Sequence, residues 1–264
     1  MRIDLHVHTN RYSACGKSSP DEMVSRAAEL GLDAIVLTEH HHFWPADELA
    51  DLQARHPEVR LFTSVEVSAA GGNDLLIYGP TGPDVFYRDM PPCDVIRQAR
   101  EMGATVVLAH PFRYAAGVSE FFEDDCRVDG VEIMSIHVLS HAHIQARALA
   151  QQLGVAEFAA SDGHHVDTIG LYAVELERPA RDEADLADLL RARRFKHYVD
   201  TQRITTANDA LRARIDEIRQ LIDQGQDNEQ IRRVMPDVGY TTLSGIRQGL
   251  DVMLPTQPIP VNGG

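Results

Sequence analysis

Two kinds of hydrophobic pattern alternate along the first 200 residues of the chain. Short runs of nearly continuous apolar residues predict buried strands, and segments in which apolar residues recur every three or four positions predict amphipathic helices. The predicted strands cover residues 2–8, 33–39, 59–68, 74–79, 104–110, 128–134, 156–162, 171–176 and 195–200. The predicted helices cover residues 18–31, 46–56, 93–103, 142–154 and 182–194.

The order of these segments favours a barrel over an open sheet. Near-continuous apolar strands, separated by helices that end in glycine, are typical of a mainly parallel sheet covered by helices. The first helix has a complete start signal, with Ser19 as the cap, Pro20 at the first position and Glu22 closing a capping box. About seven strand and helix units predict an α/β barrel.

The pattern changes near residue 204, where polar, amphipathic segments predict short helices. These helices cover residues 206–225, 228–235 and 241–253. We therefore expect a barrel domain at 1–203, a helical extension at 204–254 and a flexible tail at 255–264. The extension is interpreted as a cap on the barrel or an oligomerisation element. A helix-turn-helix that reads DNA is a competing interpretation, which is disfavoured because acidic residues there are at least as numerous as basic ones.

Composition and charge exclude several classes of protein. With 44% hydrophobic and 25% charged residues, the chain is expected to fold rather than to be disordered. The 40 acidic and 25 basic residues give a net charge of −15, which disfavours binding to duplex nucleic acid. No apolar run reaches the roughly 20 residues of a membrane span, and no signal-peptide pattern opens the chain. We therefore expect a cytoplasmic protein that does not contact membranes.

The three cysteines have no recognisable pairing signal. Cys15, Cys93 and Cys126 are odd in number, widely spaced and without any C-x-x-C pattern. Their spacing argues against a disulfide framework and against a zinc ribbon.

Residues suited to metal binding lie at the ends of the predicted strands. His6 and His8 are two residues apart on the first strand, so their imidazoles point to the same face, as a pair of metal ligands must. Further residues of this kind stand at or just after other strands: Glu39, His40, Glu66, His110, Asp162 and His164. Because the C-terminal ends of barrel strands share one rim, we expect these side chains to meet there.

Five short motifs, DLHVHT, LTEH, SVEVS, AHPFR and SDGHH, follow one another over residues 1–200. Taken together they resemble the PHP family, the polymerase and histidinol phosphatase superfamily. The resemblance implies a distorted seven-stranded (β/α)7 barrel of the PHP type, here with a C-terminal helical extension. It also implies two, or three, divalent metal ions at the rim of the barrel and hydrolysis of phosphate esters.

The resemblance assigns the metal ligands position by position. They are His6, His8, His40, Glu66, His110, Asp162 and His164. Glu66 matches the carboxylate that bridges two ions, and Glu66, Asp162 and His164 are the expected catalytic residues. Imidazole nitrogen and carboxylate oxygen suit Mn, Fe or Zn, which agrees with these assignments.

Two places depart from the family pattern. Ser13 and Ala14 stand where the family has an aspartate or histidine ligand, so one metal position would be weakened or lost. Asp74 stands where a histidine ligand is common, and as a metal ligand it would move the preference toward Mn or Mg. We therefore expect two firmly bound ions and a labile third.

Several further polar residues have more than one interpretation. Arg113 is expected to bind a phosphate oxygen of the substrate, or else to form a surface ion pair. His41 is expected to point toward the substrate. The cluster His137, His141 and His143 is interpreted as exposed polar side chains, although His137 closes a predicted strand.

The sequence thus predicts a metal-dependent phosphoesterase, in which a hydroxide bridging two metals attacks a small phosphomonoester or nucleotide. A second hypothesis is a 3′-end exonuclease or nucleotide-end phosphatase, which needs a basic or aromatic groove lined by Arg11, Tyr12, Arg113 and Tyr114. A hydrolase of a non-phosphate ester and a non-catalytic regulatory module that binds metal are also compatible with these ligands. A second copy of the chain is a further expected partner, through the C-terminal helices.

Overall fold

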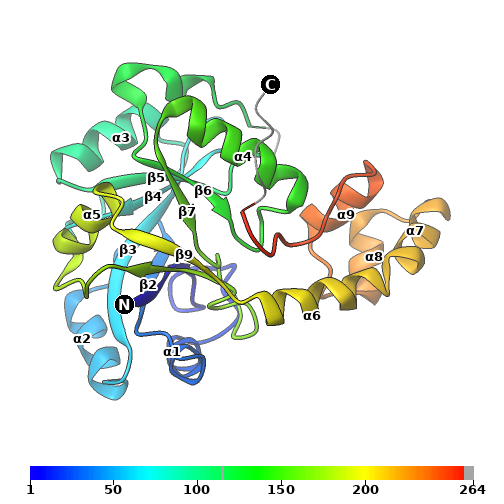
Figure 1. The fold of residues 1–264 in the computed structure, drawn as a ribbon, viewed down its shortest axis with the longest axis horizontal. Coiled ribbons are helices and arrows are strands. Elements are labelled where there is room, and N and C mark those ends of the chain that lie inside the picture. The colour runs from blue at the N-terminus through cyan, green and yellow to red at the C-terminus, as the bar shows by residue number, and fades with distance from the viewer. Residues whose placement is uncertain (114–115, 259–264) are drawn as a thin grey trace.

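Every apolar run that predicts a strand forms one in the computed structural model, which describes residues 1–113 and 116–258 (Figure 1). The strands are β1 (Arg2–Val7), β2 (Ala34–His40), β3 (Arg60–Ser68), β4 (Asp74–Tyr78), β5 (Thr105–Ala109), β6 (Gly130–Met134), β7 (Ala156–Ala159), β8 (Tyr172–Leu176) and β9 (Phe195–Val199). Together they make a nearly closed α/β barrel.

The strands lie in one sheet in the order β7-β6-β5-β4-β3-β2-β1-β8-β9. β1, β2 and β3 are parallel, as are β5, β6 and β7, whereas β4 and β8 are each antiparallel to both neighbours. The β3–β4 hairpin turns through Gly71 and Gly72, whose φ angles of 84° and 87° are rarely adopted by residues with side chains. The seven-stranded (β/α)7 count is not confirmed, because these antiparallel strands enlarge the sheet to nine.

The two edges of the sheet approach each other without a regular hydrogen-bonded ladder among the described residues. Instead, the imidazole of His197 in β9 donates from Nε2 to the carbonyl oxygen of Glu157 in β7 over 2.8 Å. The rings of Phe158 and Phe195 also pack across the same seam, with centroids 4.9 Å apart. Side chains therefore close this part of the barrel.

At the rim, the segment that follows β7 bonds to the backbone of β1. His8 N donates to Gly163 O over 2.9 Å, and Gly163 N donates to His6 O over 3.0 Å. The carboxylate of Asp4, which is fully buried, accepts hydrogen bonds from the hydroxyl and from the backbone N–H of Ser161. These bonds bring the end of β7 to β1, six places away in the sheet order, at the place where the metal-binding residues were expected.

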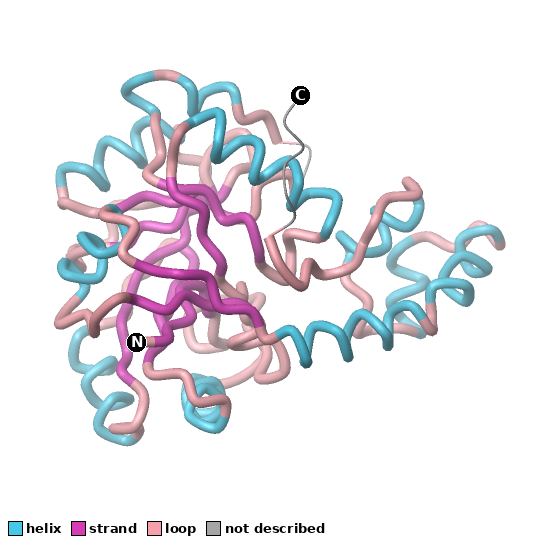
Figure 2. The backbone as a smooth tube through the Cα atoms, viewed as in Figure 1, coloured by secondary structure: helices cyan, strands magenta, loops and turns pink. Residues whose placement is uncertain are grey.

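Helices cover the outside of the barrel, and the strands lie within them (Figure 2). They are α1 (Pro20–Glu29), α2 (Ala46–Arg55), α3 (Pro92–Glu101), α4 (Ser140–Leu153) and α5 (Glu183–Arg191). The expected capping box is present at α1, where Ser19 Oγ accepts from Glu22 N over 3.3 Å and the Glu22 carboxylate accepts from Ser19 N over 2.7 Å. No helix in the described ranges combines the length and the apolar character needed to cross a bilayer.

The C-terminal helices form a lobe beside the barrel. α6 (Thr201–Arg212) leads away from it to α7 (Ile215–Asp223), α8 (Asn228–Val234) and α9 (Tyr240–Arg247) (Figure 1). The helix expected over 206–225 is therefore divided into α6 and α7. The lobe has its own hydrophobic cluster, which includes one residue that precedes α4. Its buried members are Leu139, Ile218, Ile231, Met235, Val238, Leu243, Ile246 and Val252.

After the lobe the chain returns to the barrel and caps α4. The carbonyl oxygen of Met253 accepts from Ser140 N over 2.8 Å, and that of Asp251 accepts from His141 N over 3.2 Å. These N–H groups lie in the first turn of α4, where a helix provides no partner of its own. The returning segment thus satisfies the start of a helix more than 100 positions earlier in the sequence.

Further bonds anchor the same segment. The side chain of Asn208 in α6 both donates to Leu254 O and accepts from Leu254 N, each over 2.9 Å. The hydroxyl of buried Tyr172 donates to Pro255 O over 2.8 Å. Pro255, where the expected tail begins, is buried against the barrel, and residues 259–264 of that tail lie outside the described residues.

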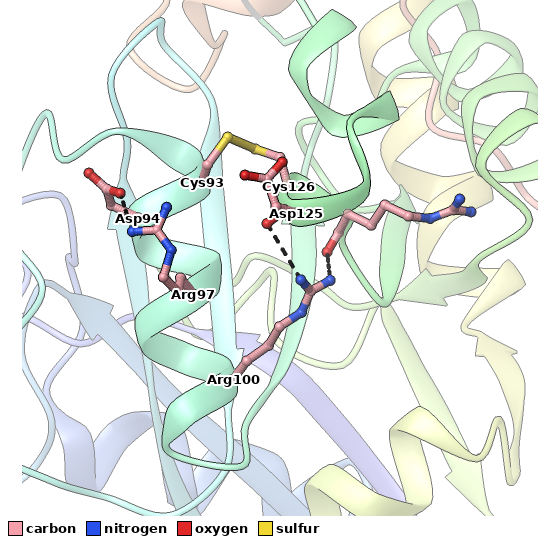
Figure 3. Close-up of a disulfide and its surroundings, with 7 residues drawn as sticks. Cys93, Asp94, Arg97, Arg100, Asp125 and Cys126 are labelled. Carbon is pink, nitrogen blue, oxygen red and sulfur yellow. Dashed lines mark hydrogen bonds and ion pairs between the residues drawn. A yellow bond between two sulfur atoms is a disulfide. The ribbon is translucent and has the colours of Figure 1, made fainter.

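Cys93 and Cys126 form a disulfide, which corrects the argument against disulfide pairing (Figure 3). Cys93 lies in the first turn of α3, and Cys126 ends the short 3-10 helix η2 (Asp124–Cys126). Arg100, further along α3, donates to the carbonyl oxygen of Arg127 over 2.7 Å and holds the same two segments together. The pairing has no signal in the sequence, because the cysteines are 33 residues apart and meet only once α3 packs against η2.

Candidate metal centre

The centre is built on β1, whose alternation turns two histidines to the same face. The side chains of His6 and His8 are fully buried, and their Nε2 atoms lie 3.0 Å apart. This juxtaposition follows from the spacing of the DLHVHT motif. Whether the two Nε2 atoms can bind a metal ion depends on which nitrogen of each imidazole carries the hydrogen.

The outer nitrogen of each imidazole has a partner that fixes where the hydrogen lies. His6 Nδ1 is 3.0 Å from Glu132 Oε1, and because a carboxylate only accepts, His6 Nδ1 carries the hydrogen. His8 Nδ1 is 3.3 Å from the hydroxyl of Ser13, which donates its single hydrogen to Glu39. The hydroxyl therefore accepts from His8 Nδ1. Both Nε2 atoms are left with lone pairs that point into the centre.

Two lone pairs that face each other at 3.0 Å repel unless positive charge lies between them. A proton can supply this charge: burial opposes protonation, but the neighbouring carboxylates of Asp162 and Glu66 raise the pKa of His8 to about 9. A divalent cation supplies more charge, and paired imidazole nitrogens are ligands of such ions. The arrangement of His6 and His8 therefore fits a metal ion.

Glu66 in β3 contacts imidazoles with both of its carboxylate oxygens. Oε1 is 2.9 Å from His110 Nε2, whereas Oε2 is 3.0 Å from His8 Nε2 and 3.3 Å from His40 Nδ1. Burial alone would raise the pKa of Glu66, but the charge of His6 and hydrogen bonds from His110 and its neighbours hold it well below its usual range. Glu66 is thus an anion in the position that a bridging carboxylate needs.

Asp162, which follows β7, reaches the same point across the seam of the barrel. Its Oδ1 is 3.3 Å from His6 Nε2 and 3.4 Å from His8 Nε2, and it has no hydrogen-bond partner among the described residues. Its Oδ2 contacts His137 Nδ1 and lies 3.6 Å from Arg113 Nη1. The φ angle of Asp162 is 52°, a strained value for a residue with a side chain, and such strain is typical of functional sites.

In the described part of the chain, four overlapping groups each bring three ligand atoms within 4.8 Å of one another. The groups are His6, Glu66 and His110; His6, His8 and Asp162; His137, Asp162 and His164; and His8, Cys15 and His40. His6, His8 and Asp162 each belong to two groups, so the groups are neighbouring positions of one centre. Their imidazole, carboxylate and thiol donors suit divalent transition-metal ions.

Residues 140–195 match the family model described as PHP-associated. The fold is similar to that of a two-domain protein from Bacteroides vulgatus that contains a predicted PHP-like metal-dependent phosphoesterase. The TM-score is 0.53 at 20% sequence identity, over 76% of this chain and 65% of that one. The family model covers part of the chain, and both similarities agree with the resemblance of the five motifs to the PHP family.

Other proteins with a similar stretch of sequence or a similar fold carry different names. A stretch of 101 residues, 38% of the chain, is 31% identical to the error-prone DNA polymerase of Mycobacterium bovis and spans 9% of that polymerase. The lesion-specific endonuclease PfuEndoQ from Pyrococcus furiosus has a similar fold, with a TM-score of 0.55 at 15% identity over 72% of this chain and 56% of that one. These similarities therefore do not identify the substrate.

The expectation of exposed histidines after β6 is wrong for two of the three. His137 lies against Asp162 at the candidate metal centre, with 21% of its side chain exposed. His143 is fully buried, with Nδ1 2.6 Å from the carbonyl oxygen of Ile133, and His141 is partly exposed. The physical reason is that α4 packs this segment against the sheet. The available signal for His137 was its place just after a strand, which it shares with the rest of the ligand-type residues.

Three residues whose roles the sequence does not settle, Asp74, Arg113 and His41, lie around the ligand groups. Asp74 is behind His110, with Oδ2 4.0 Å from His110 Nδ1, and it is placed to orient that imidazole. Arg113 points toward Asp162 inside the centre, with Nη1 3.6 Å from Asp162 Oδ2. His41 is half-buried with a φ angle of 58°, and neither ring nitrogen has a hydrogen-bond partner among the described residues.

His164 and His40 lie on either side of His8. The ring of His164 stacks on His8 with centroids 4.6 Å apart, and the ring of His40 does so at 4.7 Å. Burial lowers the pKa of His164 to about 3 and that of His40 to about 4. Both imidazoles are therefore neutral at pH 7, which is the form that binds metal.

Three carboxylates lie buried behind the ligands, and two of them, Asp4 and Glu132, have no role assigned from the sequence. Asp4 holds the segment after β7, and Glu132 binds His6 Nδ1 and accepts from the backbone N–H of His110 over 2.9 Å. Glu39 accepts from Trp44 Nε1 over 3.2 Å as well as from Ser13. The signal that could have found them is an acidic residue inside an otherwise apolar strand, which is rarely buried without partners.

Proposed function

We propose that this chain hydrolyses small phosphomonoesters or nucleotides with divalent metal ions at the centre described above. The observation that supports the proposal most is the position of Glu66, which faces His110 with one carboxylate oxygen and His8 and His40 with the other. A carboxylate in this position can hold two cations side by side, an arrangement typical of phosphate-ester hydrolysis. Bound ions would supply positive charge to the phosphate and lower the pKa of water toward neutrality.

Arg113 and His41 are the residues of the chain that we assign to the substrate. The Arg113 side chain is 19% exposed and lies 3.6 Å from Asp162, so it reaches both the centre and the solvent. A guanidinium group fits phosphate because two of its N–H groups can bond two phosphate oxygens in parallel. The free ring nitrogens of His41 offer a second polar contact beside the centre.

The side chains expected to line a nucleic-acid groove are engaged with the protein itself. Arg11 pairs with Glu48 over 2.9 Å, and its guanidinium lies 5.2 Å from the centroid of the Tyr12 ring. Tyr12 packs on His42, with ring centroids 4.3 Å apart. Tyr114 lies outside the described residues. With a net charge of −15, these contacts favour a small substrate over the end of a polynucleotide.

A substrate panel tests the proposal. Chelator-treated protein reloaded with Mn, Fe or Zn is expected to release phosphate from phosphomonoesters or mononucleotides with kcat/KM at least about tenfold above that for carboxyl esters. Preference for carboxyl esters would instead support the non-phosphate hydrolase. Faster shortening of single-stranded DNA from its 3′ end would support the exonuclease. Bound metal without turnover of any substrate would support the regulatory module.

Replacing Arg113 by lysine keeps the positive charge but removes the planar fork. We expect KM for the preferred phosphomonoester to rise about tenfold, while kcat changes less than about threefold. Steady-state kinetics measure both constants. Arg97→Lys is the matched control, because Arg97 lies on the outer helix α3 and pairs with Asp94. If Arg113→Lys leaves KM unchanged, Arg113 does not bind the phosphate.

A further inference from the structure

We propose that Cys15 supplies a sulfur ligand to a metal ion at the candidate metal centre, together with His8 and His40. The inference rests on the metal centre of the proposed function and not on its substrate. It gives one metal position a thiolate, where the residues considered from the sequence, Ser13 and Ala14, supply no ligand. An ion held there would be zinc or cobalt in preference to manganese or magnesium.

The donor atoms of the three residues converge. Cys15 Sγ and one ring nitrogen each of His8 and His40 lie within 4.8 Å of one another. His40 Nδ1 is buried, lies 3.3 Å from Glu66 Oε2, and makes no hydrogen bond in the part of the chain that the structure describes. A buried nitrogen without a hydrogen bond, next to a thiol and an imidazole, is an arrangement that a cation completes.

Ser13 does not take the place of Cys15, because its hydroxyl is already engaged in three hydrogen bonds. It accepts from His8 Nδ1 over 3.3 Å and from the backbone N–H of His40 over 3.2 Å, and it donates to Glu39. Its hydrogen-bonding capacity is therefore used in holding His8 with Nε2 toward the centre. Ser13 is a positioning residue, and Cys15 carries the next donor atom along the loop.

The loop between β1 and α1 is fixed so that Cys15 faces the centre. Ser13 N donates to Thr9 O over 3.2 Å, and Lys17 N donates to His164 O over 2.8 Å. Between them, Gly16 approaches the Thr9 backbone so closely that a Cβ there would lie 2.3 Å from the carbonyl group. Only glycine fits this turn. The loop is thus held at both ends against residues of the centre.

A thiolate changes which ion the position favours. Binding breaks the S–H bond of Cys15, a bond forms between sulfur and the metal, and the proton leaves to solvent. Thiolate ligands favour zinc and other borderline ions, whereas oxygen ligands suit manganese and magnesium. The Cys15 side chain is exposed, so it can exchange the proton and turn toward an ion between the two imidazoles.

The disulfide makes the inference directly measurable. Of the three cysteines in the sequence, Cys93 and Cys126 are bonded to each other, so a thiol reagent reports on Cys15 alone. Chelator-treated full-length protein is loaded anaerobically with cobalt(II), and the near-ultraviolet absorption is recorded. We expect a sulfur-to-cobalt charge-transfer band, and at least about a tenfold slower reaction of the thiol than in the metal-free protein.

Variants complete the test. Cys15→Ala should lose the band and about one equivalent of cobalt or zinc while the remaining metal stays bound. Cys15→Asp should also lose the band, but it should keep that equivalent and bind manganese better. Ala14→Ser, a change at the adjacent exposed residue, is the matched control and should resemble the wild type.

Two results would overturn the inference. One is cobalt-loaded wild-type protein without the band, or with the band unchanged in Cys15→Ala. The second is a thiol that reacts equally fast with and without metal, as an exposed cysteine outside the centre would. These readouts do not depend on turnover, so a failed substrate panel with a sulfur–cobalt band refutes the proposed substrate and not the ligand. An active enzyme without the band refutes the ligand alone.

Discussion

Replacing Glu66 by glutamine is expected to lower kcat/KM for phosphate-ester hydrolysis at least about 10³-fold. The amide has nearly the same size but lacks the negative charge that two neighbouring cations need. It would also turn an NH2 group toward His110 or toward His8 and His40, whose ring nitrogens contact the carboxylate oxygens in the wild type. We therefore expect metal to be lost together with activity. Kinetics on the preferred substrate and elemental analysis of the same preparation measure both.

Glu175→Gln is the matched control for this variant. Glu175 lies in β8, pairs with Arg2 over 3.0 Å, and has 46% of its side chain exposed, so the same chemical change occurs on the barrel but outside the centre. It should leave turnover and metal content at the wild-type level. Near-wild-type turnover by Glu66→Gln with full metal content would show that Glu66 is not a bridging ligand.

Truncation after residue 203 is expected to destabilise the barrel by about 5 kcal/mol or more. The deletion removes Ile204, which is fully buried in the core of the barrel. It also removes the carbonyl oxygen of Met253 that caps α4 at Ser140 and leaves the buried hydroxyl of Tyr172 without its partner. Urea unfolding followed by circular dichroism measures the loss, and size-exclusion chromatography reports any change in solubility or in oligomeric state.

Truncation after residue 258 is the matched control, because it removes only residues 259–264 and keeps the bond from Tyr172 to Pro255. This shorter deletion should leave the unfolding midpoint unchanged. The helix-turn-helix interpretation makes the opposite prediction for truncation after 203. A stable, active barrel, combined with salt-dependent binding of duplex DNA by the full chain, would show that the lobe reads DNA and does not support the barrel. Self-association through the lobe stays a prediction.

Strands and helices could be predicted because their signals are local. The run at 33–39 predicts β2, since a strand covered on both faces is apolar throughout. Ser19 and Glu22 predict the start of α1, since a capping box lies within one turn. His6 and His8 share a face because strand side chains alternate with a period of two. These features need no knowledge of the rest of the fold.

Contacts between distant segments have no such local signal in the sequence. The disulfide between Cys93 and Cys126 depends on the packing of α3 against η2, and the burial of His137 depends on how α4 covers the sheet. The three hydrogen bonds of the Ser13 hydroxyl depend on where β2 places Glu39 and His40 relative to His8. Packing and hydrogen bonding between distant parts of the chain decide each of these features. The type and spacing of residues in the sequence do not specify such contacts.

Asp162 shows most clearly what the sequence determined and what the tertiary structure determined. The sequence by itself identified Asp162 as a residue able to bind metal, because it follows an apolar strand within the SDGHH motif. Its strand β7 is six places from β1 in the sheet order, yet the backbone of Gly163 bonds both His6 and His8. That contact forms only when the twist accumulated over many strands curls the sheet until its ends meet. Local chemistry therefore determined which side chains can hold a metal ion, and closure of the barrel decided that they face one another.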